Sequence, residues 1–157
     1  MRDFSKLIIS VTVCELIGLL STPFTISSIP TWYAGLIKPF FSPPNWIFAP
    51  VWTTLYFLMG VSVYLIWRKG IENKEIKIAI YYFITQLFFN FFWSIFFFGL
   101  RLPLVAFIDI IVLLAAIVLT MMKFYKISKV SLYLLIPYLL WVSFATILNM
   151  SIVLLNR

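Results

Sequence analysis

The sequence predicts an all-α fold, a polytopic membrane protein with a bundle of five transmembrane helices, and three observations support this prediction. Hydrophobic residues make up 64% of the 157 residues and charged residues only 11%, whereas a soluble domain carries about a quarter charged residues. The apolar runs have the roughly 20 residues needed to cross a ~30 Å hydrocarbon layer. They lack the two-residue alternation of a membrane barrel, which leaves helices to satisfy the backbone within lipid.

Helix limits follow from the segments that interrupt the apolar runs. The first predicted helix ends before Pro23, because proline lacks the N–H that would continue it. Gly99 and Pro103 mark a tight turn between the third and fourth helices, and the polar stretches 68–77 and 123–129 separate the other neighbours. The predicted helices are residues 5–22, 46–67, 78–98, 104–122 and 131–155, with a long connection at 23–45, all within one domain covering 1–157.

The basic side chains between the helices predict an orientation in the membrane. With five crossings, nine lysine and arginine residues fall on one side and three on the other. Short loops rich in these residues stay inside, so we expect the N-terminus inside and both the C-terminus and the long connection outside. The nine are Arg2, Lys6, Arg68, Lys69, Lys74, Lys77, Lys123, Lys126 and Lys129, and the three are Lys38, Arg101 and Arg157.

Composition also disfavours several kinds of partner and cofactor. The net charge is +7, but the basic residues lie between the apolar runs instead of forming one stripe, so nucleic acid is not an expected partner. The chain has no histidine, which is the commonest zinc ligand and the usual proximal ligand of haem iron. Its one cysteine, Cys14, excludes an intrachain disulfide. We therefore expect no metal site and no required cofactor.

Tryptophan and polar residues recur at helical spacing on three of the predicted helices. Under the predicted topology most of them fall in the outer half of the bundle, where the long connection, with Trp32 and Tyr33, can cover them. One interpretation is a cavity walled by indole faces, which suits a flat apolar ligand; the other is a polar clamp between packed helices. The faces comprise Trp52, Tyr56 and Gly60; Gln86, Asn90, Trp93 and Phe97; and Tyr138, Trp141, Ala145 and Asn149, with Leu148 beside them.

Two carboxylates, Glu15 and Asp109, lie inside predicted helices. Glu15 is seven residues and Asp109 five residues from the outer end of its predicted helix, depths of ~10 Å and ~8 Å at 1.5 Å per residue. An ionised carboxylate at that depth is costly, and an intramembrane acid is a functional candidate for that reason. The two could relay protons in a transporter, bind a basic group, or hydrogen-bond a neighbouring helix in their protonated form.

Several segments resemble the tryptophan-rich sensory protein and translocator protein family, formerly called peripheral benzodiazepine receptors. The longest is TWYAGLIKPFFSPPNWIFAPVWTTLYFLMG, from Thr31 to Gly60; others are the FFGLR-x-P turn, FYKISK from Phe124 and PYLLWVSFATILN from Pro137 to Asn149. Their order and spacing agree with the family over nearly the whole chain. The resemblance implies a five-helix bundle, commonly a homodimer, in a prokaryotic cell membrane.

The resemblance also implies a function and a site. Family members bind porphyrins and synthetic aromatic ligands of the benzodiazepine and isoquinoline kinds, so a membrane sensory or translocator protein that binds a tetrapyrrole such as protoporphyrin is expected. The alternatives are a light-dependent porphyrin-degrading enzyme, with Trp52 and Trp141 as the candidates for photochemistry, and a small transporter. The ligand-binding residues carried over are Trp32, Trp46, Trp52, Asn90, Trp93, Trp141, Ala145, Leu148 and Asn149.

Overall fold

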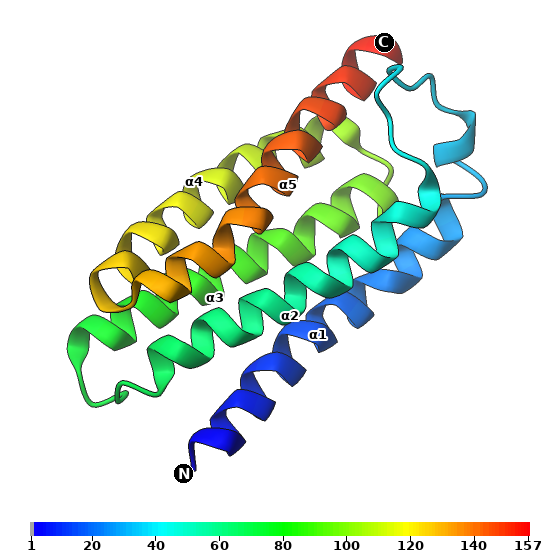
Figure 1. The fold of residues 1–157 in the computed structure, drawn as a ribbon. Coiled ribbons are helices and arrows are strands. Elements are labelled where there is room, and N and C mark those ends of the chain that lie inside the picture. Colours follow the sequence, from blue (N-terminus) through cyan, green and yellow to red (C-terminus); the bar gives the residue numbers. More distant parts are fainter. Residues whose placement is uncertain (1) are drawn as a thin grey trace.

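A computed structural model describes residues 2–157 as a bundle of long antiparallel helices (Figure 1). Within these residues five helices are long and apolar enough to cross a membrane and no strand occurs, which confirms the predicted fold class. Short turns, η1 and η2, lie in the first connection, and a π-helical turn, η3, ends the third helix. The elements are α1 (Asp3–Ser28), η1 (Tyr33–Gly35), η2 (Asn45–Ile47), α2 (Phe48–Trp67), α3 (Lys74–Ser94), η3 (Ile95–Gly99), α4 (Pro103–Ile127) and α5 (Lys129–Leu155).

The predicted end of the first helix at Thr22 is wrong, because α1 continues through Pro23 to Ser28. Proline removes one backbone hydrogen bond, but serine and threonine hydroxyls and neighbouring helices make it tolerable in a membrane helix. Pro23 leaves the Leu19 carbonyl oxygen without its helical donor, and in the same turn the hydroxyls of Ser21 and Thr22 donate to the neighbouring Gly18 carbonyl oxygen at 2.8 and 2.9 Å. The predicted connection 23–45 is correspondingly shorter, and we call residues 29–44 the cap segment.

Other helices extend further than predicted. The sequence prediction ended them at charged residues, whereas in the structure they continue past these residues. α3 begins at Lys74 instead of residue 78, and the Asn73 side chain caps it by accepting a hydrogen bond from the Glu75 N–H at 2.8 Å. The predicted basic connection 123–129 is almost entirely helical, because α4 runs to Ile127 and α5 starts at Lys129. Charged side chains at these positions reach the bundle end without ending the helix.

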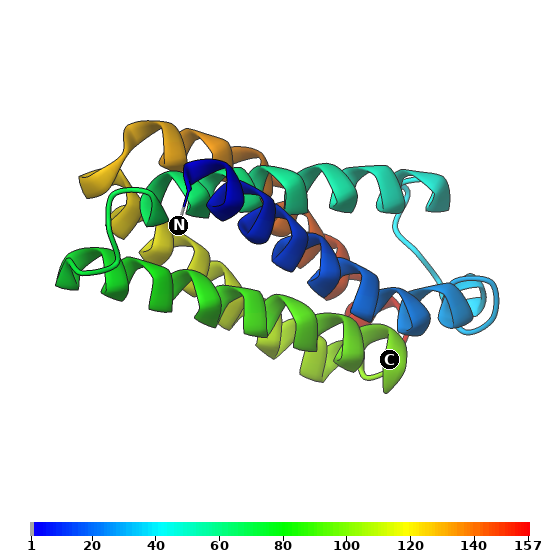
Figure 2. The same cartoon turned by 90° about the horizontal axis from the view of Figure 1, so that it is seen from below.

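α1 crosses the bundle obliquely instead of packing along one neighbour (Figure 2). Near its start it touches α2 so closely that a Cβ on Gly60 would lie 2.6 Å from the Val11 Cα. Near its end it leaves α2 and contacts η3, where the Phe24 ring packs on Gly99 and the Ser28 hydroxyl donates to the Phe98 carbonyl oxygen at 2.5 Å. α1 and α2 therefore diverge towards the cap segment.

The charged connections separate to the two ends of the bundle. The nine basic residues assigned to the inner side belong to the end that holds the N-terminus and the α2–α3 and α4–α5 turns, which we call the basic end. The cap segment, the α3–α4 turn and the C-terminus form the opposite cap end (Figure 1). Which end faces the cell interior stays a prediction.

Candidate functional site

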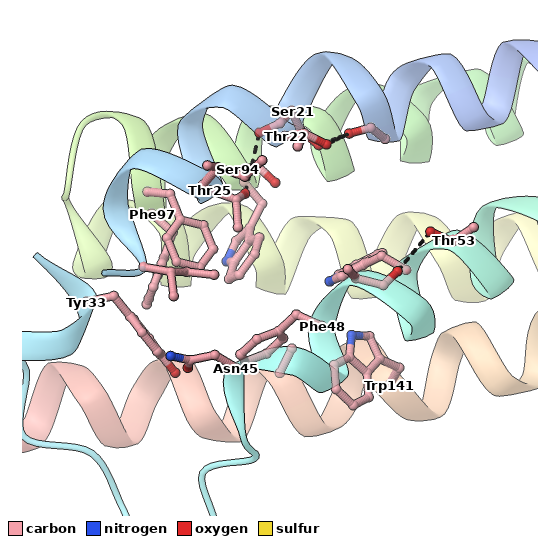
Figure 3. Close-up of a pocket in the computed structure, with 18 of the residues that line it drawn as sticks. Ser21, Thr22, Thr25, Tyr33, Asn45, Phe48, Thr53, Ser94, Phe97 and Trp141 are labelled. Atoms are coloured by element: carbon pink, nitrogen blue, oxygen red, sulfur yellow. Dashed lines mark hydrogen bonds between the residues drawn. The ribbon is translucent and has the colours of Figure 1, made fainter. Parts of the chain in front are cut away.

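A cavity of about 270 Å³ lies where α1 and α2 diverge, on the cap side of the bundle. Pockets for small molecules usually have volumes of roughly 300 to 1,000 Å³, so this one lies just below that range. Figure 3 shows Thr22 and Thr25 of α1 on one side, Phe48 and Trp141 on the other, and Tyr33 towards the cap segment. Side chains from α1, α2, the α3–η3 junction, α5 and the cap segment all contribute to its walls.

One wall consists of aromatic rings that pack on one another. The Trp93 ring stacks on Phe97 with centroids 5.1 Å apart and planes 20° apart. The Trp141 ring meets Phe48 edge-on at 6.2 Å and lies 5.5 Å from Phe144. Such pairs add about 0.5 to 1.5 kcal/mol beyond area burial, so the wall is held in shape without a ligand.

Hydrogen bonds fix the Trp93 side of this wall. The Trp93 indole N–H donates to the Asn149 side-chain oxygen at 3.0 Å, and the Asn149 amide donates to the Pro103 carbonyl oxygen at 2.9 Å. Asn149 is 1% exposed, and both of its polar atoms are thereby satisfied, as burial requires. These two hydrogen bonds link α3, α4 and α5.

A chain of buried polar groups lies beneath the cavity. The Tyr56 hydroxyl donates to the Asn90 side-chain oxygen at 2.6 Å, the Asn90 amide donates to the Tyr138 hydroxyl at 2.7 Å, and that hydroxyl donates to the Gln86 oxygen at 2.6 Å. We call these four residues the polar relay. Asn90 therefore belongs to a clamp between α2, α3 and α5, while the tryptophans form a cavity above it. The two interpretations left open by the sequence both apply, to different residues.

α1 supplies a polar wall that the sequence did not predict. Glu15, Gly18, Thr22 and Thr25 line the cavity from this helix, and their spacing of three, four and three residues places them on one helical face. This wall was not predicted because the helix was expected to end at Thr22, and the tryptophans and amides whose spacing indicated a site lie on later helices. The spacing itself was the available signal.

The cavity is open between α1 and α2. Leu19 and Ile26 both line it, yet they are 64% and 66% exposed, and Ala49 and Thr53 of α2 are exposed as well. These residues lie inside helices that span the hydrocarbon layer by length and composition. The open side therefore faces acyl chains, and the cap segment covers the end that faces water.

Tyr33 anchors the cap segment over the cavity. It is 2% exposed, the Lys38 ammonium donates to its carbonyl oxygen at 2.9 Å, and the same ammonium lies 4.8 Å from the centre of its ring. Burial raises the pKa of the Tyr33 phenol above its ordinary value of 10.0, and a hydrogen bond with the Ser42 hydroxyl opposes that shift. The Asn156 side chain also pairs with the backbone of Ile37 through two 2.9 Å hydrogen bonds, which tie the segment to the end of α5.

The structure brings together six of the nine residues expected to bind ligand. Trp32 instead packs edge-on against Phe97, 5.6 Å away, behind the cavity wall. Trp46 is 73% exposed in η2, and Asn90 lies in the polar relay, so neither lines the cavity. The six that line it are Trp52, Trp93, Trp141, Ala145, Leu148 and Asn149.

Two buried polar atoms have no hydrogen-bond partner within residues 2–157. One is the Trp141 indole nitrogen, on a ring that lines the cavity, and the other is a carboxylate oxygen of Asp109 on α4. Asp109 is 6% exposed and does not line the cavity. The Trp141 ring lines the cavity, but its indole nitrogen is itself covered by protein atoms and has no acceptor.

Comparison with known proteins identifies relatives across the whole chain. A sequence model described as the TspO/MBR family matches residues 10–155. The tryptophan-rich protein TspO of Archaeoglobus fulgidus is 50% identical over 151 residues, which cover 96% of this chain and 97% of the relative. The protein of the same name from Chlorobaculum tepidum is 39% identical over 99% of this chain and 98% of its own. The human translocator protein is 39% identical over 75% of this chain and 70% of its own.

Proposed function

Because the chain belongs to the TspO/MBR family of multi-pass membrane proteins, we propose that it binds a flat hydrophobic tetrapyrrole, such as protoporphyrin, in the cavity between α1 and α2. Binding of this kind suits a sensory or translocator protein, the terms by which relatives from Cereibacter sphaeroides and humans are named.

The observation that supports the proposal is the preformed aromatic wall beside the opening between α1 and α2. Trp52, Trp93 and Trp141 reach the cavity from three different helices, so a planar ring can contact several aromatic faces at once. Their neighbours already hold these rings in place, and a preorganised site loses little side-chain entropy on binding. Because the cavity holds only about 270 Å³, one edge of a tetrapyrrole would protrude through the open side into the acyl chains.

The same residues favour a metal-free ring. Haem iron is usually held by histidine, cysteine, methionine or tyrosine. The sequence has no histidine, no cysteine or methionine is among the described residues that line the cavity, and the hydroxyls of the two lining tyrosines are engaged, that of Tyr56 with Asn90 and that of Tyr33 with Ser42. Stacking on the aromatic faces would therefore provide most of the affinity.

Substitution of Trp141 tests the proposal. Loss of one stacking face is worth about 0.5 to 1.5 kcal/mol beyond area burial, so Trp141→Ala should weaken protoporphyrin binding several-fold. Binding is measured by quenching of the remaining tryptophan fluorescence in lipid nanodiscs, with folding verified by circular dichroism.

Two tryptophans outside the cavity serve as controls. Trp67→Ala removes a ring at the basic end, where the Lys6 ammonium lies 5.8 Å from its centre, and Trp46→Ala removes an exposed ring. Both should bind protoporphyrin as the parent does. Equal affinity of the parent and the folded Trp141→Ala protein would contradict the proposed site.

A second candidate function, light-dependent degradation of the porphyrin, is favoured by one observation. The Trp52 ring lies 5.6 Å from Tyr56 and 6.4 Å from Tyr138, and both phenols belong to the polar relay. Oxidisable rings thus extend from the cavity wall into the bundle. Spectra of the purified complex under a lamp and in darkness separate the two candidates, because binding alone leaves both spectra unchanged.

A further inference from the structure

Glu15 is the one charged side chain among the described residues that line the cavity. The proposed function uses the aromatic faces and gives this carboxylate no role. Glu15 lies ten residues before Thr25 on the same wall, which corresponds to about 15 Å along a helix. It therefore marks the end of the cavity farthest from the cap segment, and the two ends of the cavity differ in charge.

The nearby hydroxyl groups are already used in other hydrogen bonds. The Tyr56 ring lies directly against Gly18, one helical turn from Glu15, but its hydroxyl donates to Asn90 at 2.6 Å. The Thr22 hydroxyl donates to the Gly18 carbonyl oxygen at 2.9 Å. The carboxylate is therefore an acceptor at the end of a cavity whose adjacent donors point elsewhere.

We propose that Glu15 determines ligand specificity by binding a basic group, such as a protonated amine, at the deep edge of a flat aromatic ligand. An intramembrane carboxylate is stabilised by an opposite charge, and a charge-assisted hydrogen bond is about twice as strong as a neutral one. The same carboxylate repels acidic substituents, so a ring with carboxylates would bind with those groups towards the cap segment. This inference rests on the proposed function only in assuming that the cavity holds a flat ring.

The test compares three derivatives of one ring whose side-chain substituents differ in charge. Protoporphyrin carries two carboxylates, its dimethyl ester carries none, and its bis(dimethylaminoethyl) amide carries two ammonium groups at neutral pH. Dissociation constants are measured by tryptophan quenching in nanodiscs of zwitterionic lipid. The parent should bind the ammonium form most tightly and the carboxylate form least tightly.

Glu15→Gln should remove about tenfold of the preference for the ammonium form over the ester, the change expected when a hydrogen bond to a charged group is lost. Affinity for the ester should change less than twofold. Glu75→Gln removes the same charge from an exposed site in the first turn of α3, and it should leave all three constants unchanged. Glu15→Met, with an apolar side chain of similar length, gives the same readout if the glutamine variant does not fold.

The outcomes separate this inference from the proposed function. A parent that binds the ester but shows no preference for the ammonium form, or a variant that keeps the preference, overturns the assignment of Glu15 and leaves the proposed function standing. Failure of all three porphyrins to bind the parent overturns the proposed function. The planar cation 9-aminoacridine and uncharged anthracene then test Glu15: a cation preference that Glu15→Gln abolishes supports it, and any other result refutes it.

Discussion

Removal of single hydroxyl groups from the polar relay tests whether it clamps the bundle together. Tyr56 makes one hydrogen bond in the relay, to Asn90 at 2.6 Å, whereas the Tyr138 hydroxyl makes two, from Asn90 at 2.7 Å and to Gln86 at 2.6 Å. Substitution by phenylalanine keeps each ring and removes only the hydroxyl. Tyr138→Phe therefore removes twice as many hydrogen bonds as Tyr56→Phe, and it should lower the free energy of unfolding about twice as much.

The expected magnitude follows from the burial of the relay. Hydrogen bonds between membrane helices contribute about 0.6 kcal/mol on average and up to about 1.7 kcal/mol. These bonds are short, and their residues are at most 4% exposed. A polar group that loses its partner there cannot hydrogen-bond to water instead. The contribution of each bond to the free energy of unfolding should therefore lie in the upper half of that range. We expect Tyr56→Phe to lower the free energy of unfolding by about 1 kcal/mol and Tyr138→Phe by about 2 kcal/mol.

The assay is reversible unfolding in mixed micelles, followed by circular dichroism. Tyr81→Phe is the matched control, because its side chain is 64% exposed on the outside of α3. The double variant Tyr56→Phe/Asn90→Leu should be less destabilised than the sum of its two single variants, since both remove the same bond. A loss for Tyr138→Phe no greater than that for Tyr56→Phe, or strict additivity in the double variant, would refute the description of the relay as a connected clamp.

The remaining predictions concern the α1 contact and the cap segment. Gly60→Ala should destabilise the bundle by about 1 to 3 kcal/mol through overpacking, because the new Cβ meets the Val11 backbone at 2.6 Å; Gly35→Ala, with nothing within 4 Å, should unfold like the parent in the same assay. Asn156→Ala should speed proteolysis of the cap segment by removing both bonds to Ile37; an unchanged cleavage rate would contradict this. Since the folded pKa of Tyr33 is raised from 10.0, the folded state holds this proton more tightly, and stability should fall as pH rises above about 10; Tyr33→Phe should lack that component in pH-dependent unfolding.

The sequence predicted the helices well because their main determinant is local. A continuous apolar run of membrane-spanning length needs no knowledge of its neighbours to be recognised. The end of α1 was misplaced because the penalty of Pro23 is usually large in a helix interior, whereas hydroxyls at that turn and contacts with η3 support the longer helix. The η3 residue that Ser28 contacts lies seventy residues further along the chain, so no local pattern reveals this contact.

The site was predictable only where helical phase alone decides which way a side chain points. Trp52, Trp93 and Trp141 lie within regular helices, so their faces could be read from spacing, and all three line the cavity. Trp46 lies in η2, before α2 begins, where the phase of the following helix does not apply. The resemblance carried it into the site, but its side chain is 73% exposed.

The opening between α1 and α2 arises from two close contacts at opposite ends of α1. At one end Gly60 lets the helix approach α2 at backbone distance, and at the other Gly99 and Ser28 hold it against η3. A helix that touches α2 at Val11 and η3 near Phe24 and Ser28 diverges from α2 along its length. One face of its later turns, with Thr22 and Thr25, therefore borders the opening. A ligand there would touch the aromatic wall and α1 together, and binding would stabilise the bundle by about 2.7 kcal/mol at a free concentration one hundred times its dissociation constant. The close contacts at Gly60 and Gly99 therefore determine where the opening between α1 and α2 lies.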